Sequence, residues 1–279
     1  MAKNRKYKNK AKAAKVKSMM AELADKYMLY EQAVQCVEAE ADFVDKTFKR
    51  LRGRSPRTLR EDFCGTMNSS CEWVRRRHNT IAYAVDIDPG VLDWGRDHHL
   101  SELTADQVKR LHIFNTDVMQ ADVPPTDAVV AMNFSYWIFK DRANMKHYFD
   151  RIYRGLNKDG VLFLDAFGGY EAFQEMQEST KYNGFTYIWE QAHYNPITGD
   201  ATLYIHFKFK DGSRIKKAFT YHWRMWTLPE LTELLQEAGF KASVYWEGTD
   251  KDGEGNGVFT PTTKGEADAG WIAYIVAAK

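Results

Sequence analysis

The feature that most constrains this chain is the rhythm of residues 57–168, where short apolar runs alternate with longer amphipathic stretches. The apolar runs are the expected strands, and they cover Thr58–Phe63, Ile81–Val85, Leu111–Asn115, Ala128–Asn133 and Val161–Phe167. The stretches between them contain apolar residues at helical spacing. Regular alternation of strand and helix predicts an α/β fold with a doubly wound, mostly parallel sheet.

The pattern changes between residues 169 and 226. Phe185–Tyr194, Ala201–Lys210 and Ile215–Trp226 alternate with period two, and Gly- and Asp-containing turns separate them. We therefore expect an antiparallel β-hairpin cap inserted at 169–226. Thr227 and Glu230 then form a capping box that starts a helix. The last two expected strands are 242–247 and 271–277.

The N-terminal part divides into two segments. Residues 1–17 contain eight Lys or Arg and almost no apolar residue, which predicts a disordered basic tail. A nucleic-acid-binding arm and a targeting segment are the alternatives. Residues 18–50 have helical spacing, and the sequence from Arg52 to Pro56 ends that helix, so 18–56 is an N-terminal helical segment.

The composition excludes several classes of protein. The net charge of +1 gives the whole chain no strong attraction for nucleic acid or an anionic membrane. Three cysteines without a CxxC pair fit neither a disulfide framework nor a structural zinc site, and no metal site is expected. The chain has no long apolar run and no secretory signal, so we expect a cytoplasmic protein without membrane contact. The sequence does not indicate the oligomeric state.

Polar residues at the ends of the predicted strands carry the expected chemistry. After the first strand, Gly65 permits a close backbone approach to a ligand, and either Glu61 or Asp62 can accept a hydrogen bond from a ligand ammonium group. Asp86 lies about twenty residues later, where an acidic side chain reaches a ribose diol. Ile87 is placed to pack against a purine face. The predicted ligand therefore contains a nucleoside.

Two further strand ends complete the ligand site. Asp117 and Val118 follow the third strand and are placed beside an adenine amino group, and the turn after the fourth strand faces the reactive end of the ligand. The expected cofactor-binding residues at these strand ends are Arg60, Glu61, Asp62, Phe63, Cys64, Gly65, Thr66, Asp86, Ile87, Asp117, Val118, Asn133, Phe134 and Ser135.

With these motifs, residues 57–168 and 226–277 resemble the class I S-adenosylmethionine-dependent methyltransferase family. The first motif of that family has three glycines, and this chain keeps the acid and the middle glycine but has Phe63 and Met67 at the outer positions. The resemblance implies S-adenosylmethionine as cofactor, S-adenosylhomocysteine as product, and seven strands with the last antiparallel. It also implies a methyltransferase domain at 57–279, a lid at 18–56 with Tyr30 as a further cofactor-binding residue, and a turn at 156–160 before the fifth strand.

The acceptor is expected over the ends of the fourth and fifth strands, below the cap. The aromatic residues of the cap suit a small amine or amino acid through cation–π contact, although alternating aromatics also serve simply as sheet packing. The expected catalytic residues are Tyr136 and Asp165. The expected substrate-binding residues are Trp137, Phe167, Glu190, Tyr221 and Trp223.

Three other functions compete with methylation of a small molecule. A nicotinamide-dependent dehydrogenase is disfavoured by the missing glycines and by the lack of a Tyr-x-x-x-Lys pair with a matching serine. An RNA or DNA methyltransferase would use the basic tail, but the near-neutral remainder shows no nucleic-acid-binding module, so nucleic acid is not an expected partner. A scaffold that binds the cofactor without turnover is the third alternative.

Overall fold

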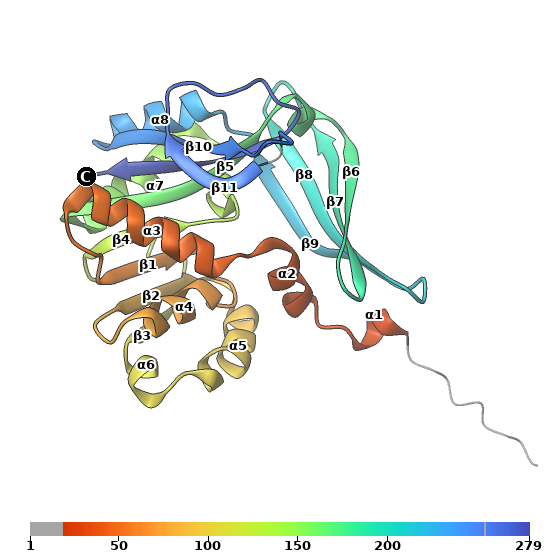
Figure 1. Cartoon of the computed structure of the whole chain (residues 1–279), viewed down its shortest axis with the longest axis horizontal. Coiled ribbons are helices and arrows are strands. Elements are labelled where there is room, and N and C mark those ends of the chain that lie inside the picture. Colours follow the sequence, from red (N-terminus) through yellow and green to blue (C-terminus); the bar gives the residue numbers. More distant parts are fainter. Residues whose placement is uncertain (1–18, 254) are drawn as a thin grey trace, which may run out of the picture.

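The chain forms two β-sheets with helices around the larger one (Figure 1). The computed structural model describes residues 19–253 and 255–279, so the predicted basic tail at 1–17 lies outside the described residues. The larger sheet has eight strands in the order β11-β10-β12-β5-β4-β1-β2-β3, and the smaller has four in the order β6-β7-β8-β9.

The larger sheet confirms the predicted doubly wound fold. Its first five strands are parallel neighbours, while β12 is antiparallel to both β5 and β10. Its strands are β1 (Thr58–Asp62), β2 (Ile81–Asp86), β3 (Leu111–Asn115), β4 (Thr126–Ala131), β5 (Leu156–Gly168), β10 (Lys241–Thr249), β11 (Gly255–Pro261) and β12 (Trp271–Ala278).

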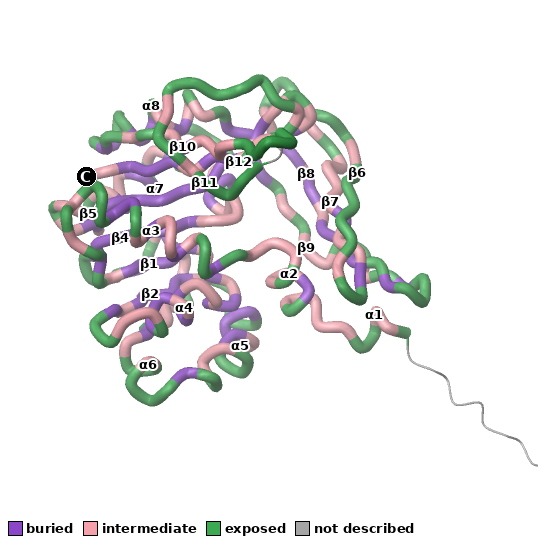
Figure 2. The backbone as a smooth tube through the Cα atoms, in the orientation of Figure 1, coloured by how far each residue is buried: buried purple, intermediate pink, exposed green. Residues whose placement is uncertain are grey.

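Two details of this sheet differ from the prediction. An eighth strand, β11, extends the sheet beside β10; it is mostly exposed (Figure 2), so it lacks the apolar pattern by which a strand is recognised. The expected turn at 156–160 belongs to β5 instead. The register against β4 shifts between Leu156 and Val161, and this irregularity absorbs the extra residues.

Helices cover both faces of the larger sheet. One face packs against α3 (Val37–Arg52), α4 (Asn68–Arg76) and α5 (Pro89–His98) through a buried cluster that includes Phe48 and Trp73. The other face packs against α7 (Arg142–Gly155) and α8 (Leu228–Glu237) through a cluster that includes Phe149 and Leu234. The short elements are η1 (Leu100–Glu102), α6 (Ala105–Lys109), η2 (Ser135–Ile138) and η3 (Tyr170–Phe173).

The smaller sheet confirms the predicted antiparallel cap. It contains β6 (Met176–Lys181), β7 (Phe185–Tyr194), β8 (Asp200–Phe209) and β9 (Arg214–Arg224). Strand β6 was not predicted, because it is a largely exposed edge strand. The cap has its own apolar cluster, which includes Phe185, Phe207 and Leu29 from the N-terminal helices.

The N-terminal segment contains three helices rather than one. They are α1 (Met20–Leu23), α2 (Lys26–Val34) and α3, with breaks at Ala24-Asp25 and Gln35-Cys36. Asp25 causes the first break, because its side chain accepts hydrogen bonds from the Tyr27 and Met28 amides as an N-cap. As a result α2 lies between the cap and the larger sheet (Figure 1).

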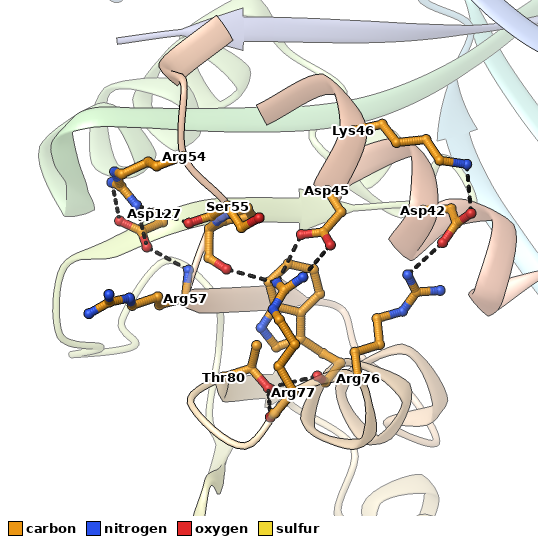
Figure 3. A network of polar contacts seen from close by, with 12 residues as sticks. Asp42, Asp45, Lys46, Arg54, Ser55, Arg57, Arg76, Arg77, Thr80 and Asp127 are labelled. Carbon is orange, nitrogen blue, oxygen red and sulfur yellow. Dashed lines mark hydrogen bonds and ion pairs between the residues drawn. The ribbon is translucent and has the colours of Figure 1, made fainter. Parts of the chain in front are cut away.

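A polar network fixes α3 at the amino edge of the larger sheet (Figure 3). Arg76 at the end of α4 donates to Asp42 of α3 over 2.6 Å, and Arg77 pairs with Asp45 one turn further along. Arg54, just after α3, pairs with Asp127 of β4 over 2.8 Å. These contacts fix the position of α3 against β1 and β4. None of the helices in the described residues is long and apolar enough to cross a membrane.

Candidate functional site

The candidate site lies at the carboxyl edge of the parallel strands. Strands β1, β2 and β4 run in the same direction, so the residues that follow Asp62, Asp86 and Ala131 meet at one edge. In open α/β sheets, this edge is where ligands bind. Two adjoining cavities occupy it, one of about 290 Å³ and one of about 810 Å³.

The loop after β1 keeps a left-handed backbone where the expected glycines are missing. Phe63, Gly65 and Met67 have φ angles of 57°, 51° and 63°. A left-handed conformation costs a non-glycine residue about 1–2 kcal/mol. Packing offsets this cost, because Met67 is fully buried and the Phe63 ring lies 6.1 Å from the Tyr148 ring. The loop therefore has three left-handed positions although only one is glycine.

The two acids of this loop line the smaller cavity but already have partners. The Glu61 carboxylate accepts hydrogen bonds from the amide and hydroxyl of Ser70, and burial raises the pKa of Glu61 to about 7. The Asp62 carboxylate accepts from Arg60 over 2.6 Å and from the Tyr148 hydroxyl over 2.9 Å. Burial raises the pKa of Asp62 although Arg60 opposes the shift.

Arg60 and Val118 correct the sequence interpretation. Both are buried, and Arg60 also donates to the Val118 carbonyl over 3.0 Å. Neither lines the smaller cavity. They support the cavity wall from behind and do not offer a side chain to a ligand.

Asp86 lines the smaller cavity at the end of β2. Its carboxylate accepts from the Gly65 amide over 2.8 Å and from the Asp88 amide over 2.9 Å. Burial raises the pKa of Asp86. Because a carboxylate oxygen accepts more than one hydrogen bond, both oxygens keep capacity for the hydroxyls of a diol.

Ile87 and Asp117 lie beyond the residues that line this cavity. Ile87 is 68% exposed, an unusual position for a large apolar side chain. Asp117 accepts from the Met119 amide over 2.8 Å and thereby holds the turn after β3. Most of the predicted cofactor-binding residues line the cavity itself, namely Tyr30, Glu61, Asp62, Phe63, Cys64, Gly65, Thr66, Asp86, Asn133 and Ser135.

Asp165 holds the turn after β4. The amides of Asn133 and Phe134 donate to its two carboxylate oxygens over 2.7 and 2.9 Å. Both residues have a φ of 57°, so the carboxylate stabilises a turn that is otherwise unfavourable. Burial raises the pKa of Asp165 to about 7, and Glu40 adds to the shift. Asp165 and Phe134 line the larger cavity.

Tyr136 and Trp137 do not reach either cavity, contrary to the roles expected from sequence. Tyr136 is fully buried, and its hydroxyl donates to the Asp165 carbonyl over 2.7 Å. Trp137 is also fully buried and stacks behind Phe167 at 4.9 Å. The left-handed turn at 133–134 directs η2 into the core, which explains both positions.

The larger cavity is bounded by the cap, α2, α3 and the ends of β5 and β12. It shares the side chains of Tyr30, Asn133, Tyr221 and Trp223 with the smaller cavity, so the two spaces adjoin at these residues. Phe167 also lines it. Four aromatic residues of this wall were not among the predicted site residues: Tyr187, Trp189, Trp271 and Tyr274.

The charge of the larger cavity is one-sided. Five carboxylates line it and no Lys, Arg or His does, among the residues that the structure describes; they are Glu40, Asp165, Glu171, Glu178 and Glu247. Glu190 is not one of them. It lies on the opposite face of β7 from Trp189, because successive side chains of a strand point to opposite faces. On that face Glu190 pairs with His206 over 2.6 Å.

Helix α2 connects the two halves of the site. The Thr66 hydroxyl in the loop after β1 donates to Glu31 over 2.5 Å, and Asn68 donates to Gln35 over 3.0 Å. On its other side the ring of Tyr30 lies 4.8 Å from Phe219 of the cap. Within 19–253 and 255–279, no group of three or more His, Cys, Asp or Glu is arranged to hold a metal ion.

Comparison with known proteins gives a match in structure but not in sequence. No protein-family model matches the chain, and no curated protein matches it. A solved S-adenosylmethionine-dependent methyltransferase from Clostridium acetobutylicum ATCC 824 superposes with a TM-score of 0.67 at 15% identity, covering 90% of this chain and 96% of that one. The chain has the S-adenosylmethionine-dependent methyltransferase fold.

Two further methyltransferases share this fold over nearly their whole length. An amino pentose methyltransferase from Micromonospora echinaspora has a TM-score of 0.65 at 15% identity, with 90% of this chain and 95% of that one covered. A sugar N-methyltransferase from Streptoalloteichus sp ATCC 53650 has a TM-score of 0.61 at 17% identity, with coverage of 100% and 98%.

Proposed function

We propose that this chain transfers the methyl group of S-adenosylmethionine to an amine nitrogen of a small molecule. The observation that carries the proposal is that two cavities meet: the smaller has the Asp86 carboxylate in its wall, and the larger is lined by aromatic rings and carboxylates and, among the described residues, by no Lys, Arg or His. Protonated amines are favoured by both wall types, through ion pairing and cation–π contact. Solved proteins with this fold include an amino pentose methyltransferase and a sugar N-methyltransferase.

The residues present fit the cofactor. We assign the ribose hydroxyls to Asp86, the purine to the exposed face of Ile87 with Asp117 nearby, and the amino acid end to the loop around Gly65. Because Glu61 and Asp62 keep their internal hydrogen bonds, either contributes only its remaining acceptor capacity to an ammonium group. Helix α2, with Tyr30, serves as the lid. The bound sulfonium supplies an activated methyl group.

The protein's own contribution is alignment and exclusion of water. Tyr30, Asn133, Tyr221 and Trp223 separate the cofactor from the acceptor, and we place the transferred group between them. Asp165 acts by positioning the Asn133–Phe134 turn. Tyr136 supports the same strand end from the core.

The chamber wall disfavours the nucleic-acid alternative. A nucleic-acid enzyme neutralises phosphates with Lys and Arg, whereas the described wall of this chamber carries five acids and neither of these residues. Phosphate groups near such a wall would be repelled.

Calorimetric titration with S-adenosylmethionine tests the cofactor assignment. The Asp86→Ala change removes at least one charge-assisted hydrogen bond, worth about 1.5–3 kcal/mol, so the dissociation constant rises at least about 10-fold. Asp93→Ala is the matched control, because Asp93 pairs with Arg96 on the exposed face of α5. Equal affinities for all three proteins would contradict the assignment, and mass spectrometry with a panel of amines tests the transfer itself.

A further inference from the structure

We propose that Glu40 is the residue that binds the acceptor amine and takes its proton, which rests on the amine methylation proposed above. Glu40 lies in the first turn of α3 and lines the larger cavity. It was not predicted as a site residue. An acidic residue in a first helical turn is ordinary, because it favours the helix dipole, and so carries no signal of function.

Glu40 borders the larger cavity and a small void beside the smaller cavity. Besides the larger cavity, it lines a void of about 20 Å³ together with Ser69, Val130 and Met132. Those three residues also line the smaller cavity, where we place the cofactor. Glu40 therefore lines the larger cavity and, through this void, lies behind residues that border the smaller cavity.

The other carboxylates of the chamber are less suitable. Both oxygens of Asp165 accept backbone amides, and Glu247 accepts from the Gly257 amide over 2.7 Å. Glu171 lies in η3. Glu178 lies on β6, which is three strand spacings, or about 14 Å, from β9 and its cofactor-proximal residues.

The groups around Glu40 are acids and phenols. Five of them interact electrostatically with Glu40. They are Glu38 in the same turn, Asp165 of β5, Tyr274 of β12, Glu61 of β1 and Tyr30 of α2. No Lys, Arg or His in the described part of the chain forms an ion pair with Glu40. An ammonium group brought here is stabilised by several negative charges.

Burial gives Glu40 the acid–base character that the step requires. Its pKa is raised to about 6, mainly by burial, with a backbone hydrogen bond from Cys36 opposing the shift and the charge of Glu38 adding to it. A carboxylate with that pKa is ionised at pH 7 and is a stronger base than an ordinary glutamate. The network between α3 and α4 in Figure 3 holds the helix that carries it.

The step balances in protons and electrons. The ammonium nitrogen of the acceptor gives a proton to a carboxylate oxygen of Glu40, which leaves a neutral amine with a lone pair. That lone pair forms the new bond from nitrogen to the methyl carbon, while the bond from the methyl carbon to sulfur breaks and leaves its electron pair on sulfur. The product nitrogen carries the positive charge, and the proton on Glu40 returns to solvent.

The test compares Glu40→Gln with Glu38→Gln, a neighbouring acid on the exposed side of the same turn. Calorimetry without cofactor measures binding of benzylamine, a cation, and of benzyl alcohol, its neutral counterpart. We expect Glu40→Gln to weaken benzylamine binding at least 10-fold, to leave benzyl alcohol unchanged, and Glu38→Gln to match wild type. Glu40→Asp, which keeps the charge, restores part of the affinity.

The pH profile of kcat/KM gives a second readout. Wild type shows a rising limb near pH 6 that Glu40→Gln lacks and Glu38→Gln keeps. If Glu40→Gln binds benzylamine as Glu38→Gln does, or keeps the limb, the assignment of Glu40 is wrong and methyl transfer to amines stands. If wild type binds S-adenosylmethionine but methylates no amine, the proposed function itself fails, and the assignment with it.

Discussion

Replacement of Asp127 tests whether the polar network at the amino edge anchors the scaffold on which the site is built. Four residues donate to this carboxylate: Arg54 over 2.8 Å, the Arg57 amide over 2.7 Å, the Thr58 amide over 3.4 Å and Asn157 over 2.9 Å. Burial opposes ionisation, but these hydrogen bonds outweigh it and lower the pKa of Asp127 from 3.8 to about 2. A shift of that size corresponds to about 2 kcal/mol of stability.

The sign follows from the direction of the shift. Because the folded pKa is depressed, the stabilisation is fully present above the unfolded pKa and is lost as the pH falls toward 2. In Asp127→Asn the side-chain carbonyl oxygen remains an acceptor, but an NH₂ group replaces the second oxygen and points at donors that it cannot accept from. We expect it to lower the free energy of unfolding by about 2–4 kcal/mol at pH 7, and Tm by about 5–15 °C.

Urea denaturation at pH 7 and at pH 3 measures both quantities. The difference between wild type and Asp127→Asn shrinks at pH 3, where wild-type Asp127 is closer to protonation. A double-mutant cycle with Arg54→Met isolates the ion pair, and the matched control is Asp106→Asn, whose exposed carboxylate pairs with Arg110 on the surface. A loss below 1 kcal/mol at pH 7, or one that does not change with pH, would refute this reasoning.

Two further predictions concern the site. Thr66→Ala removes the hydroxyl that donates to Glu31 of α2, so S-adenosylmethionine binds about 5–10-fold more weakly if α2 is the lid, and an unchanged calorimetric affinity counts against that role. Trp223→Ala lowers kcat/KM for an amine acceptor at least 10-fold, because Trp223 lines both cavities. Glu190→Gln changes kcat/KM less than twofold, because Glu190 lies on the other face of β7. A larger effect of Glu190→Gln than of Trp223→Ala would contradict the placement of the chamber.

Strand–helix alternation was enough to predict the parallel sheet and its carboxyl edge, and period-two alternation was enough to predict the cap. The periodicity of apolar residues and the ends of the strands both depend on local sequence. The residues that follow Asp62 and Asp86 accordingly lie at the carboxyl edge of the sheet, as predicted. The break in the N-terminal helix was missed although Asp25 is a capping residue, since an apolar stripe continues across it. The outward position of Glu190 was available from the period-two alternation that places Trp189 on the inner face.

Other features depend on contacts that no local pattern encodes. Tyr136 and Trp137 turn into the core because Asp165, from a different strand, holds the turn at 133–134 in a left-handed conformation. Glu40 reaches the site because α3 crosses the sheet after a break, and because the Arg76 and Arg77 contacts fix that crossing. Both depend on pairings between residues more than thirty positions apart.

The wall shared by the two cavities makes the ligands thermodynamically dependent on each other. Four side chains face both spaces, so a molecule that shifts them from one side changes the surface offered to a molecule on the other side. By linkage, any factor by which the nucleoside ligand changes the affinity for an amine must equal the factor by which the amine changes the affinity for the nucleoside ligand. Titrations in the two orders of addition therefore yield the same coupling energy.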